Sequence, residues 1–205
     1  MFYSKSNKLL FIHVPKNAGT LIRSALKNQY PNSIDLWGVS KLVDMAHLMP
    51  HQFPKQIKEA VNDPELKILA MLRDPYERAF SAYQQHCRQY ANHPKLAQSF
   101  EDYLEAIKQE EYRKSRDGYI FIHGAPQVKF LYYKDCLLPN ILLNCSGEWK
   151  SKLDQVLKCN LKYKNSSIRK TPRLSSDNKE NIEAIYREDF VLFENLIKYE
   201  TEKCS

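Results

Sequence analysis

The sequence lacks a cysteine framework and any spacing typical of a metal site. Its five cysteines are dispersed without a C-x-x-C pair, at positions 87, 136, 145, 159 and 204. An odd, dispersed set in a chain of 205 residues favours reduced thiols in a cytosolic protein over a disulfide scaffold. Histidine and cysteine do not recur at metal-ligand spacing, so we expect no metal centre.

Long hydrophobic runs are also missing. No apolar stretch approaches the roughly 20 residues of a membrane-spanning helix. The first eight residues, MFYSKSNK, do not have the pattern of a signal peptide. The sequence has no repeats, no low-complexity tract and no clear linker. We therefore expect a single domain over residues 1–205, without an integral membrane segment.

Acidic residues are in the minority. Lysine and arginine number 31 against 24 aspartates and glutamates, which gives a formal net charge of +7. This balance suits an anionic cofactor, an acidic glycan or a nucleic acid. The densest basic stretch, residues 150–173, is either a loop that closes over a cofactor or a solvated basic face.

The most informative pattern that is present spans residues 8–26, KLLFIHVPKNAGTLIRSAL. Leu9–Val14 predicts a buried strand of a parallel sheet, Pro15 ends it, and the apolar residues from Leu21 onward recur at helical spacing. A strand, a short loop and a helix start together direct free N–H groups and the positive end of the helix dipole at one point. Because Lys16 adds a full charge there, we interpret the loop as a phosphate- or sulfate-binding turn. Small residues also serve tight turns for geometry alone.

This loop does not match the Walker A motif. That motif, G-x-x-x-x-G-K-[ST], requires the lysine directly after its second glycine. Here Lys16 precedes Gly19, the only glycine nearby, by three positions. The order argues against a nucleotide kinase of the related phosphate-loop architecture, which would also need a hydroxyl and an acidic group for magnesium.

A second strand-loop-helix unit spans residues 66–83, LKILAMLRDPYERAFSAY. Leu66–Leu72 predicts another buried strand, with Arg73 at its carboxyl end, and the letters DPYE that follow are typical of a capped helix start. Ligands of open α/β sheets bind outside the carboxyl ends of strands. Lys16 and Arg73 therefore indicate a ligand with two anionic clusters. Pairing of Arg73 with a neighbouring carboxylate, Asp74 or Glu77, is the alternative.

Both segments resemble sulfotransferases that use 3′-phosphoadenosine 5′-phosphosulfate (PAPS). Lys16-x-x-Gly19-Thr20 after a strand resembles their 5′-phosphosulfate loop. Arg73-Asp74-Pro75-x-x-Arg78-x-x-Ser81-x-Tyr83 resembles their 3′-phosphate site. The likeness is greatest to the carbohydrate sulfotransferases, the group that includes heparan uronyl 2-O- and chondroitin-type enzymes. Residues 123–127, HGAPQ, and residues 186–193 are also similar to the family.

The resemblance implies a role for each site residue. Lys16 is expected to neutralise charge on the bridging oxygen as its bond to sulfur breaks. Arg73 and the Ser81 hydroxyl are expected to hold the 3′-phosphate. The 5′-phosphate is expected to bind the Thr20 hydroxyl and the backbone N–H groups of residues 18–20. The family often has serine or threonine where this chain has Leu21, so one hydroxyl contact is absent. The whole cofactor-binding loop comprises Lys16, Asn17, Ala18, Gly19, Thr20 and Leu21.

The acceptor hydroxyl must lose a proton, and histidine is the leading type of general base near neutral pH. His47 and His51 lie in the interval in which the family carries its proposed base. We favour His47 as the catalytic base and keep His51 as the alternative. His13, inside the first strand, is interpreted as a core or supporting residue, and His86 and His93 as solvated.

The remaining periodicity predicts an α/β fold. We expect an amphipathic helix over residues 99–113, a helix through 127–133, a buried strand over 140–145 followed by a helix, and a long closing helix over 181–197. We expect a three-layer α/β domain with a central parallel sheet of four to five strands, and the resemblance implies the P-loop-like sulfotransferase fold. On the helix after Arg73, Arg78 and Ser81 are expected outside the core stripe, which comprises Tyr76, Ala79, Phe80, Tyr83, Cys87 and Tyr90.

The expected function is transfer of the sulfuryl group from PAPS to a hydroxyl of a carbohydrate or glycolipid, with a small metabolite as the next choice of acceptor and no nucleic acid partner. Family members in the animal Golgi usually carry an anchor ahead of the catalytic domain. Its absence favours a cytoplasmic, bacterial enzyme over a lumenal domain separated from its anchor. Two alternatives remain: a nucleotide-dependent kinase, and a noncatalytic module that binds an anionic polymer.

Overall fold

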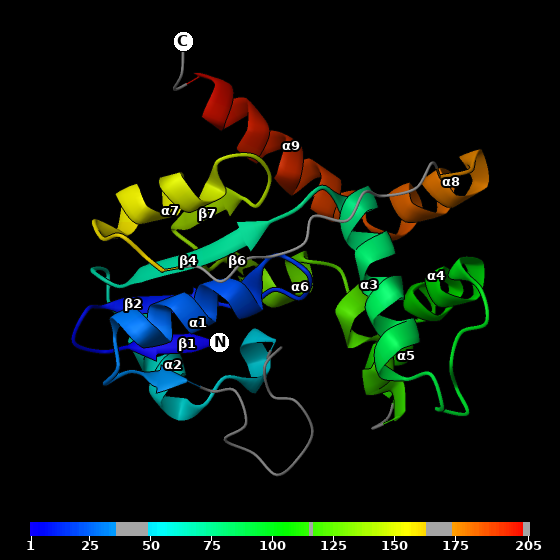
Figure 1. The fold of residues 1–205 in the computed structure, drawn as a ribbon, viewed down its shortest axis with the longest axis horizontal. Coiled ribbons are helices and arrows are strands. Elements are labelled where there is room, and N and C mark those ends of the chain that lie inside the picture. Colours follow the sequence, from blue (N-terminus) through cyan, green and yellow to red (C-terminus); the bar gives the residue numbers. More distant parts are fainter. Residues whose placement is uncertain (36–48, 115–116, 163–173, 203–205) are drawn as a thin grey trace. The chain divides into compact units, whose positions relative to one another are not determined.

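The computed structural model describes residues 1–35, 49–114, 117–162 and 174–202. The chain forms two compact units (Figure 1). The first comprises Met1–Leu72 and Val128–Ser167, and the second comprises Arg73–Gln127 and Ile168–Ser205. Each unit is assembled from two separate stretches of chain, and a single domain over residues 1–205 stays a prediction.

A five-stranded sheet forms the centre of the first unit, in the order β3-β1-β2-β4-β7. Strand β4 is parallel to both of its neighbours, β2 and β7, whereas β1 is antiparallel to β2 and β3. The parallel centre confirms the predicted fold class. The edge is antiparallel because the short connection between β1 and β2 allows only a hairpin. The strands are β1 (Phe2–Ser4), β2 (Leu9–Ile12), β3 (Ile34–Asp35), β4 (Lys67–Leu72) and β7 (Ile141–Asn144).

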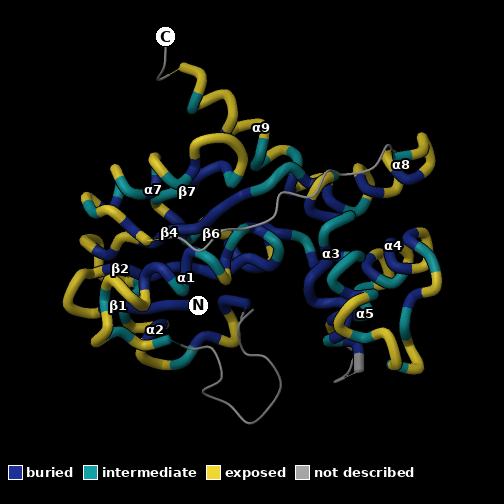
Figure 2. The backbone as a smooth tube through the Cα atoms, in the orientation of Figure 1, coloured by how far each residue is buried: buried dark blue, intermediate teal, exposed yellow. Residues whose placement is uncertain are grey.

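Both faces of this sheet are buried. Leu69 and Met71 of β4 belong to a hydrophobic cluster with residues of α1 (Gly19–Gln29) and α7 (Trp149–Leu157). Successive side chains of a strand point to opposite faces, and the alternate residue Ala70 is fully buried as well. Figure 2 shows β4 in the colour of buried residues along most of its length. Burial on both faces is what a three-layer arrangement requires. Shorter elements of this unit are α2 (Lys55–Ala60), η2 (Pro50–Gln52), α6 (Val128–Leu131) and the hairpin β5 (Tyr132–Tyr133) with β6 (Cys136–Leu137).

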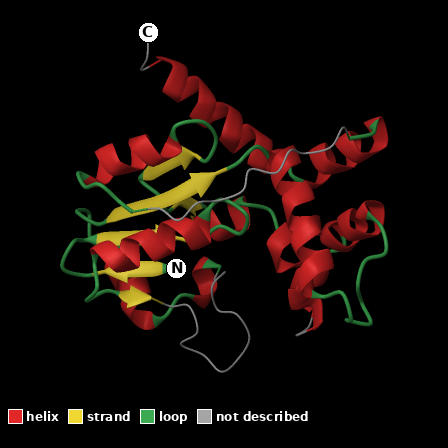
Figure 3. Cartoon of the chain, viewed as in Figure 1, coloured by secondary structure: helices red, strands yellow, loops and turns green. Residues whose placement is uncertain are grey.

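The described residues of the second unit form helices and loops without a strand (Figure 3). Its interior is aromatic, and neighbouring ring centroids lie 4.9 to 5.8 Å apart. The rings belong to Tyr83, His86, Phe100, Tyr103 and Phe121. Such rings bury large apolar areas, so this unit has a core of its own. Its helices are α3 (Pro75–Gln89), α4 (Phe100–Lys108), α5 (Glu111–Lys114), η3 (Asp117–Gly124), α8 (Ser176–Ile185) and α9 (Arg187–Glu202).

Three of the predicted helices differ from the structure. The helix expected over 99–113 divides into α4 and α5, because Glu110 adopts a left-handed φ of 54°. The helix expected through 127–133 ends at Leu131, and the next two residues pair with β6. The closing helix divides at Tyr186 into α8 and α9. Apolar spacing continues across each break, so periodicity alone does not reveal the change of direction.

The buried face of α3 also differs from the predicted one. Ala79 is buried as expected, but Arg78, Ala82 and His86 are buried too. The predictions that Arg78 lies outside the core and that His86 is solvated were wrong. Both polar side chains hydrogen-bond to backbone groups of the interior, which makes their burial tolerable. The expected stripe residues that are only half-buried are Tyr76, Phe80, Tyr83, Cys87 and Tyr90.

Candidate functional site

The loop after β2 has an unusual backbone. Lys16 has a φ of 68° and Ala18 a φ of 57°, whereas Asn17 between them is not left-handed. Left-handed backbone costs a non-glycine residue roughly 1–2 kcal/mol. Alternation of this kind turns successive N–H groups toward one concavity, the arrangement that binds anions in phosphate loops. The loop therefore carries strain in a form that suits an anionic ligand.

Helix α1 begins directly after this loop and supplies further donors. No side chain within the described chain caps its N-terminus, and its first turn contains no acidic residue. The Ala18 carbonyl accepts from the N–H groups of Leu21 and Ile22, so the helix starts in regular geometry. The first N–H groups of a helix have no partner within it, and together with the dipole they attract negative charge. The predicted helix start after the loop is confirmed.

Asn17 ties the loop to the neighbouring strand. Its side chain is 1% exposed, and its Nδ2 donates to the carbonyl of Met71 in β4 at 2.7 Å. This bond fixes the loop against the sheet. The expected role of Asn17 in cofactor binding therefore concerns its backbone, because its side chain is occupied by the strand.

Gly19 is required by a close approach that the sequence did not reveal. A Cβ at this position would lie 1.9 Å from Cδ2 of His13 and 2.2 Å from its Nε2. The His13 ring stacks on Phe11, with centroids 6.2 Å apart, and is buried as predicted. The imidazole thus lies directly beneath the helix start. The ring of His13, and not only the approach of a ligand, explains why residue 19 has no side chain.

The other loop residues differ in exposure. Lys16 is half-buried and Thr20 is exposed, so the Thr20 hydroxyl lies at the surface. Leu21 packs against the hydrophobic cluster of α1 and α7. The side chain of Leu21 therefore contributes packing, and any contact it makes with a ligand is apolar or through its backbone.

The segment after β4 is organised by side chains. The Asp74 carboxylate accepts from the Glu77 N–H at 3.0 Å, and Pro75 stands at the first helical position. This cap confirms the predicted start of α3. The Arg73 Nε donates to the Glu77 carboxylate at 3.1 Å, so the pairing foreseen as the alternative for Arg73 is present. Glu77 and Ser81 are four residues apart, hence on one face of the helix, and Arg73 reaches the same face through Glu77.

A buried polar network supports the segment 123–127, which the sequence marked only as similar to the family. Arg78, 1% exposed, donates through Nη2 to the carbonyls of His123 and Ala125 at 3.2 and 2.7 Å. The Tyr186 hydroxyl donates to the Gly124 carbonyl at 2.6 Å, and burial raises the pKa of this phenol. Each donor belongs to a residue at least 45 positions away in the sequence, so the spacing of residues within the segment could not predict these contacts.

Of the two candidate bases, only His51 lies within the described residues. His47 lies outside them. His51 is exposed in η2, so solvent reaches its ring. His86 is fully buried: its Nδ1 lies 3.2 Å from the Ile120 carbonyl, and its Nε2 accepts from the Ala97 N–H at 3.0 Å. Burial lowers the pKa of His86.

The predicted site residues form two groups. Residues 16–21 stand together in the first unit. Arg73, which precedes the cap of α3, and Ser81, on α3, stand in the second. Contact of both groups with one ligand stays a prediction. Within the described ranges, no group of three or more His, Cys, Asp or Glu residues is arranged to hold a metal ion.

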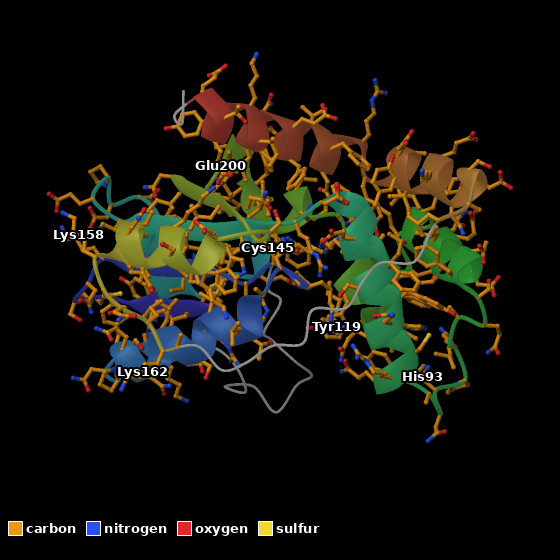
Figure 4. All side chains as sticks on the ribbon, turned by 45° about the horizontal axis from the view of Figure 1, so that its top comes forward. His93, Tyr119, Cys145, Lys158, Lys162 and Glu200 are labelled. Atoms are coloured by element: carbon orange, nitrogen blue, oxygen red, sulfur yellow. The ribbon has the colours of Figure 1, made fainter. Side chains whose placement is uncertain are left out.

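The basic stretch 150–173 is described up to residue 162. Lys158 and Lys162 follow the end of α7 (Figure 4), and Lys158 ends that helix with a left-handed φ of 53°. Residues 163–173 lie outside the described part of the chain, so closure of a loop over a cofactor stays a prediction. None of the helices in the described ranges combines the length and apolar character needed to cross a membrane.

Comparison with known proteins identifies the family. The chain matches the sulfotransferase family over residues 1–196. The match includes both strand-loop-helix segments, and the chain belongs to this family. Searches of curated proteins and of solved structures find no match.

Proposed function

We propose that the protein transfers the sulfuryl group of PAPS to a hydroxyl group of a carbohydrate or glycolipid. Membership of the sulfotransferase family supports sulfuryl transfer in general. The observation that carries the assignment of PAPS as the donor is the loop after β2, whereas the acceptor class rests on the resemblance to carbohydrate sulfotransferases. In this loop, left-handed Lys16 and Ala18 precede a helix N-terminus that has no side-chain cap in the described chain.

The loop and α1 bind the 5′-phosphosulfate end of PAPS. The N–H groups of Ala18, Gly19 and Thr20, with the Thr20 hydroxyl, hold the 5′-phosphate. The positive end of the α1 dipole adds to this attraction. These donors are held in place before the ligand arrives, because Asn17 anchors the loop to Met71.

Lys16 acts on the bond that breaks. The acceptor oxygen attacks sulfur, a new S–O bond forms, and the bond from sulfur to the bridging phosphate oxygen breaks with its electron pair on that oxygen. A cation beside the bridging oxygen stabilises the transition state more than the ground state. The products are the sulfated acceptor and adenosine 3′,5′-bisphosphate (PAP). The acceptor proton passes to a general base, for which His47 is the first candidate and His51 the second.

Arg73 and Ser81 hold the 3′-phosphate of the same cofactor. Arg73 is bonded directly to Leu72, the last residue of β4, and β4 pairs with β2, the strand that leads to Lys16. The Arg73 side chain and Ser81 share one face of α3 with Glu77. A guanidinium and a hydroxyl provide charge-assisted hydrogen bonds to a phosphate.

The test is transfer of radiolabelled sulfate from PAPS to a panel of saccharides, glycolipids and small hydroxyl metabolites. We expect transfer to at least one saccharide or glycolipid. Label only on a small metabolite would overturn the acceptor class but keep the reaction. Absence of PAPS-dependent label on the whole panel and on cell extracts would overturn the proposal.

Calorimetry distinguishes the two rival functions. We expect PAP to bind without magnesium and ATP to bind weakly. A magnesium-dependent preference for ATP would instead indicate a kinase. Affinity for an anionic polymer that falls steeply with salt and survives Lys16→Ala would indicate a noncatalytic binding module.

The identity of the base is tested by His47→Ala and His51→Ala. Loss of the base should lower kcat and remove the rising limb of its pH profile, with little change in PAP affinity. We expect this result for His47→Ala. The same result for His51→Ala alone would transfer the role to His51.

A further inference from the structure

The side chain of Gln127 holds the backbone of Arg73 from both sides. The Arg73 N–H donates to Gln127 Oε1 at 3.1 Å, and Gln127 Nε2 donates to the Arg73 carbonyl at 3.0 Å. Gln127 is fully buried. Both ends of the amide therefore bind one residue, the arginine that the proposed function assigns to the 3′-phosphate.

Arg73 needs such a partner because it belongs to no regular element. It follows the last residue of β4 and precedes Asp74, the cap of α3. The Gln127 amide supplies one acceptor and one donor to its two backbone groups, as a neighbouring strand would. These two hydrogen bonds form an amide clamp on the Arg73 backbone. Because the direction of the Arg73 side chain depends on this backbone, the clamp orients the guanidinium.

Gln127 is itself held from behind. Its N–H donates to Asp189 Oδ2 at 2.8 Å, and Asp189 is fully buried on α9. The preceding carbonyls of residues 123–125 accept from Arg78 and Tyr186. Arg78 and Asp189 are buried charged side chains, and their burial carries a desolvation penalty that apolar residues would avoid. Both bind the segment 123–127, which indicates that the position of this segment matters beyond the packing of the unit.

We infer that Gln127 is a positioning residue for the 3′-phosphate, acting through Arg73, and this inference rests on the proposed function. Gln127 has no direct contact with the cofactor in this scheme. It keeps Arg73 at the strand end in the orientation that a 3′-phosphate requires. The expected consequence is selectivity for nucleotides that carry a 3′-phosphate.

The chain offers a matched control in Asn140. Its Oδ1 accepts from the Ile68 N–H and its Nδ2 donates to the Leu66 carbonyl, both at 2.8 Å. This is the same two-bond amide clamp, placed at the opposite end of β4. Removing Asn140 loses a backbone clamp of the same kind without touching Arg73.

The experiment measures the Kd values of PAP and adenosine 5′-monophosphate (AMP) by calorimetry for the parent, Gln127→Ala, Gln127→Met, Asn140→Ala and Arg73→Ala. The two ligands differ by the 3′-phosphate, so the ratio of their Kd values isolates that group. For Gln127→Ala we expect PAP affinity to fall about tenfold, the effect of losing one to two hydrogen bonds, with AMP affinity unchanged. Asn140→Ala should leave both affinities unchanged.

Gln127→Met is the neutral variant of similar length, because it removes both hydrogen bonds to Arg73 without adding a charge. It should lower PAP affinity in the same direction and stand in if Gln127→Ala does not fold. In the Arg73→Ala background, Gln127→Met should add little, since its effect passes through Arg73.

Two results overturn the inference. Either the Gln127 variants keep the parental ratio of PAP to AMP affinity, or PAP and AMP affinities fall together. In both cases a parent that binds PAP better than AMP leaves the proposed function standing. A parent without preference for PAP overturns the proposed function as well.

Discussion

The segments that follow β2 and β4 hold their residues in different ways. After β2, the backbone itself is shaped, with left-handed Lys16 and Ala18 and a helix start that takes no side-chain cap from the described chain. After β4, side chains fix the backbone: Asp74 caps α3, and the Gln127 amide binds the N–H and the carbonyl of Arg73.

The difference has an electrostatic consequence. The N-terminus of α3 already has Asp74 as its cap and Glu77 in its first turn, so its donors and dipole face negative charge from the chain itself. The N-terminus of α1 has no acidic residue in its first turn. The backbone after β2 therefore favours an anion, whereas after β4 we expect a cationic side chain to bind it.

The largest expected effect concerns the charge in the first segment. Lys16→Ala should lower kcat by about 100- to 1,000-fold, the range for losing one preorganised group that stabilises transition-state charge. The measurement is sulfate transfer from PAPS at saturating acceptor. Lys58→Ala, an exposed lysine of α2, is the control and should keep parental activity. Parental turnover in Lys16→Ala would remove that lysine from the mechanism.

The shape of the same segment is tested at Gly19. Gly19→Ala places a methyl group inside the His13 ring, so the free energy of unfolding should fall by about 1–3 kcal/mol through overpacking. Urea unfolding measures this change. Adding His13→Ala should remove the clash, so that the alanine at position 19 has little further effect in that background. Gly147→Ala meets no atom within 4 Å but stands at a left-handed φ of 60°, so this variant measures backbone strain without a clash.

The uncapped helix start can be made to resemble that of α3. Ala18→Asp places a carboxylate at the N-cap of α1, and we expect PAP affinity to fall by at least about tenfold through repulsion between like charges. Ala18→Asn has the same shape without the charge, and asparagine also tolerates left-handed backbone. It should bind PAP nearly as the parent does. Equal affinities for the two variants would argue against an anion at this position.

The cap of α3 should matter for stability alone. Asp74→Ala removes the acceptor for the Glu77 N–H, and loss of such a cap costs about 1 kcal/mol. We expect this decrease in the free energy of urea unfolding. Ser175→Ala removes the equivalent bond at the start of α8 and should give a similar decrease. A much larger effect of Asp74→Ala on PAP affinity than on stability would mean that α3 binds the anion through its N-terminus after all.

The smallest effect is expected from pH. Burial lowers the pKa of His86, and the neighbouring His93 acts in the same direction. Below the ordinary histidine pKa of about 6.5, His86 binds a proton in the unfolded chain but stays neutral in the folded chain. The stabilising contribution of His86 is therefore complete above about pH 6.5 and is lost as the pH falls through the lowered value. Urea unfolding of the parent and of His86→Gln between pH 7.5 and pH 5 should show a steeper loss in the parent.

Local patterns identified the two strand-loop-helix segments correctly. Of the strand predicted over Leu9–Val14, Leu9–Ile12 is present, so His13 and Val14 follow the strand. The strand ending at Leu72 is present, and α3 has the cap that its first residues predict. These features depend on residues within a few positions of one another, such as Asp74 and Glu77. Sequence-local reasoning reaches such features because hydrogen bonds between near neighbours form with little loss of chain entropy.

The errors share a cause. His86 and Arg78 looked like surface residues on a helical wheel, yet their partners are carbonyls and N–H groups of residues 97 to 125. The breaks at Glu110 and Tyr186 likewise leave no mark in the apolar spacing. A polar side chain is buried only where a distant segment supplies its hydrogen bonds, and no pattern along the chain states which segment that is.

The order of charge, glycine and apolar runs by itself indicated the fold class and the family, and it predicts that the loop after β2 binds an anion. Only the tertiary structure shows that the His13 ring leaves no room for a side chain at position 19. Only the tertiary structure shows that the Gln127 amide binds the backbone of Arg73. The physical reason is that backbone conformation and capping are local, whereas close packing and burial of polar groups are settled between segments that meet only when the chain folds.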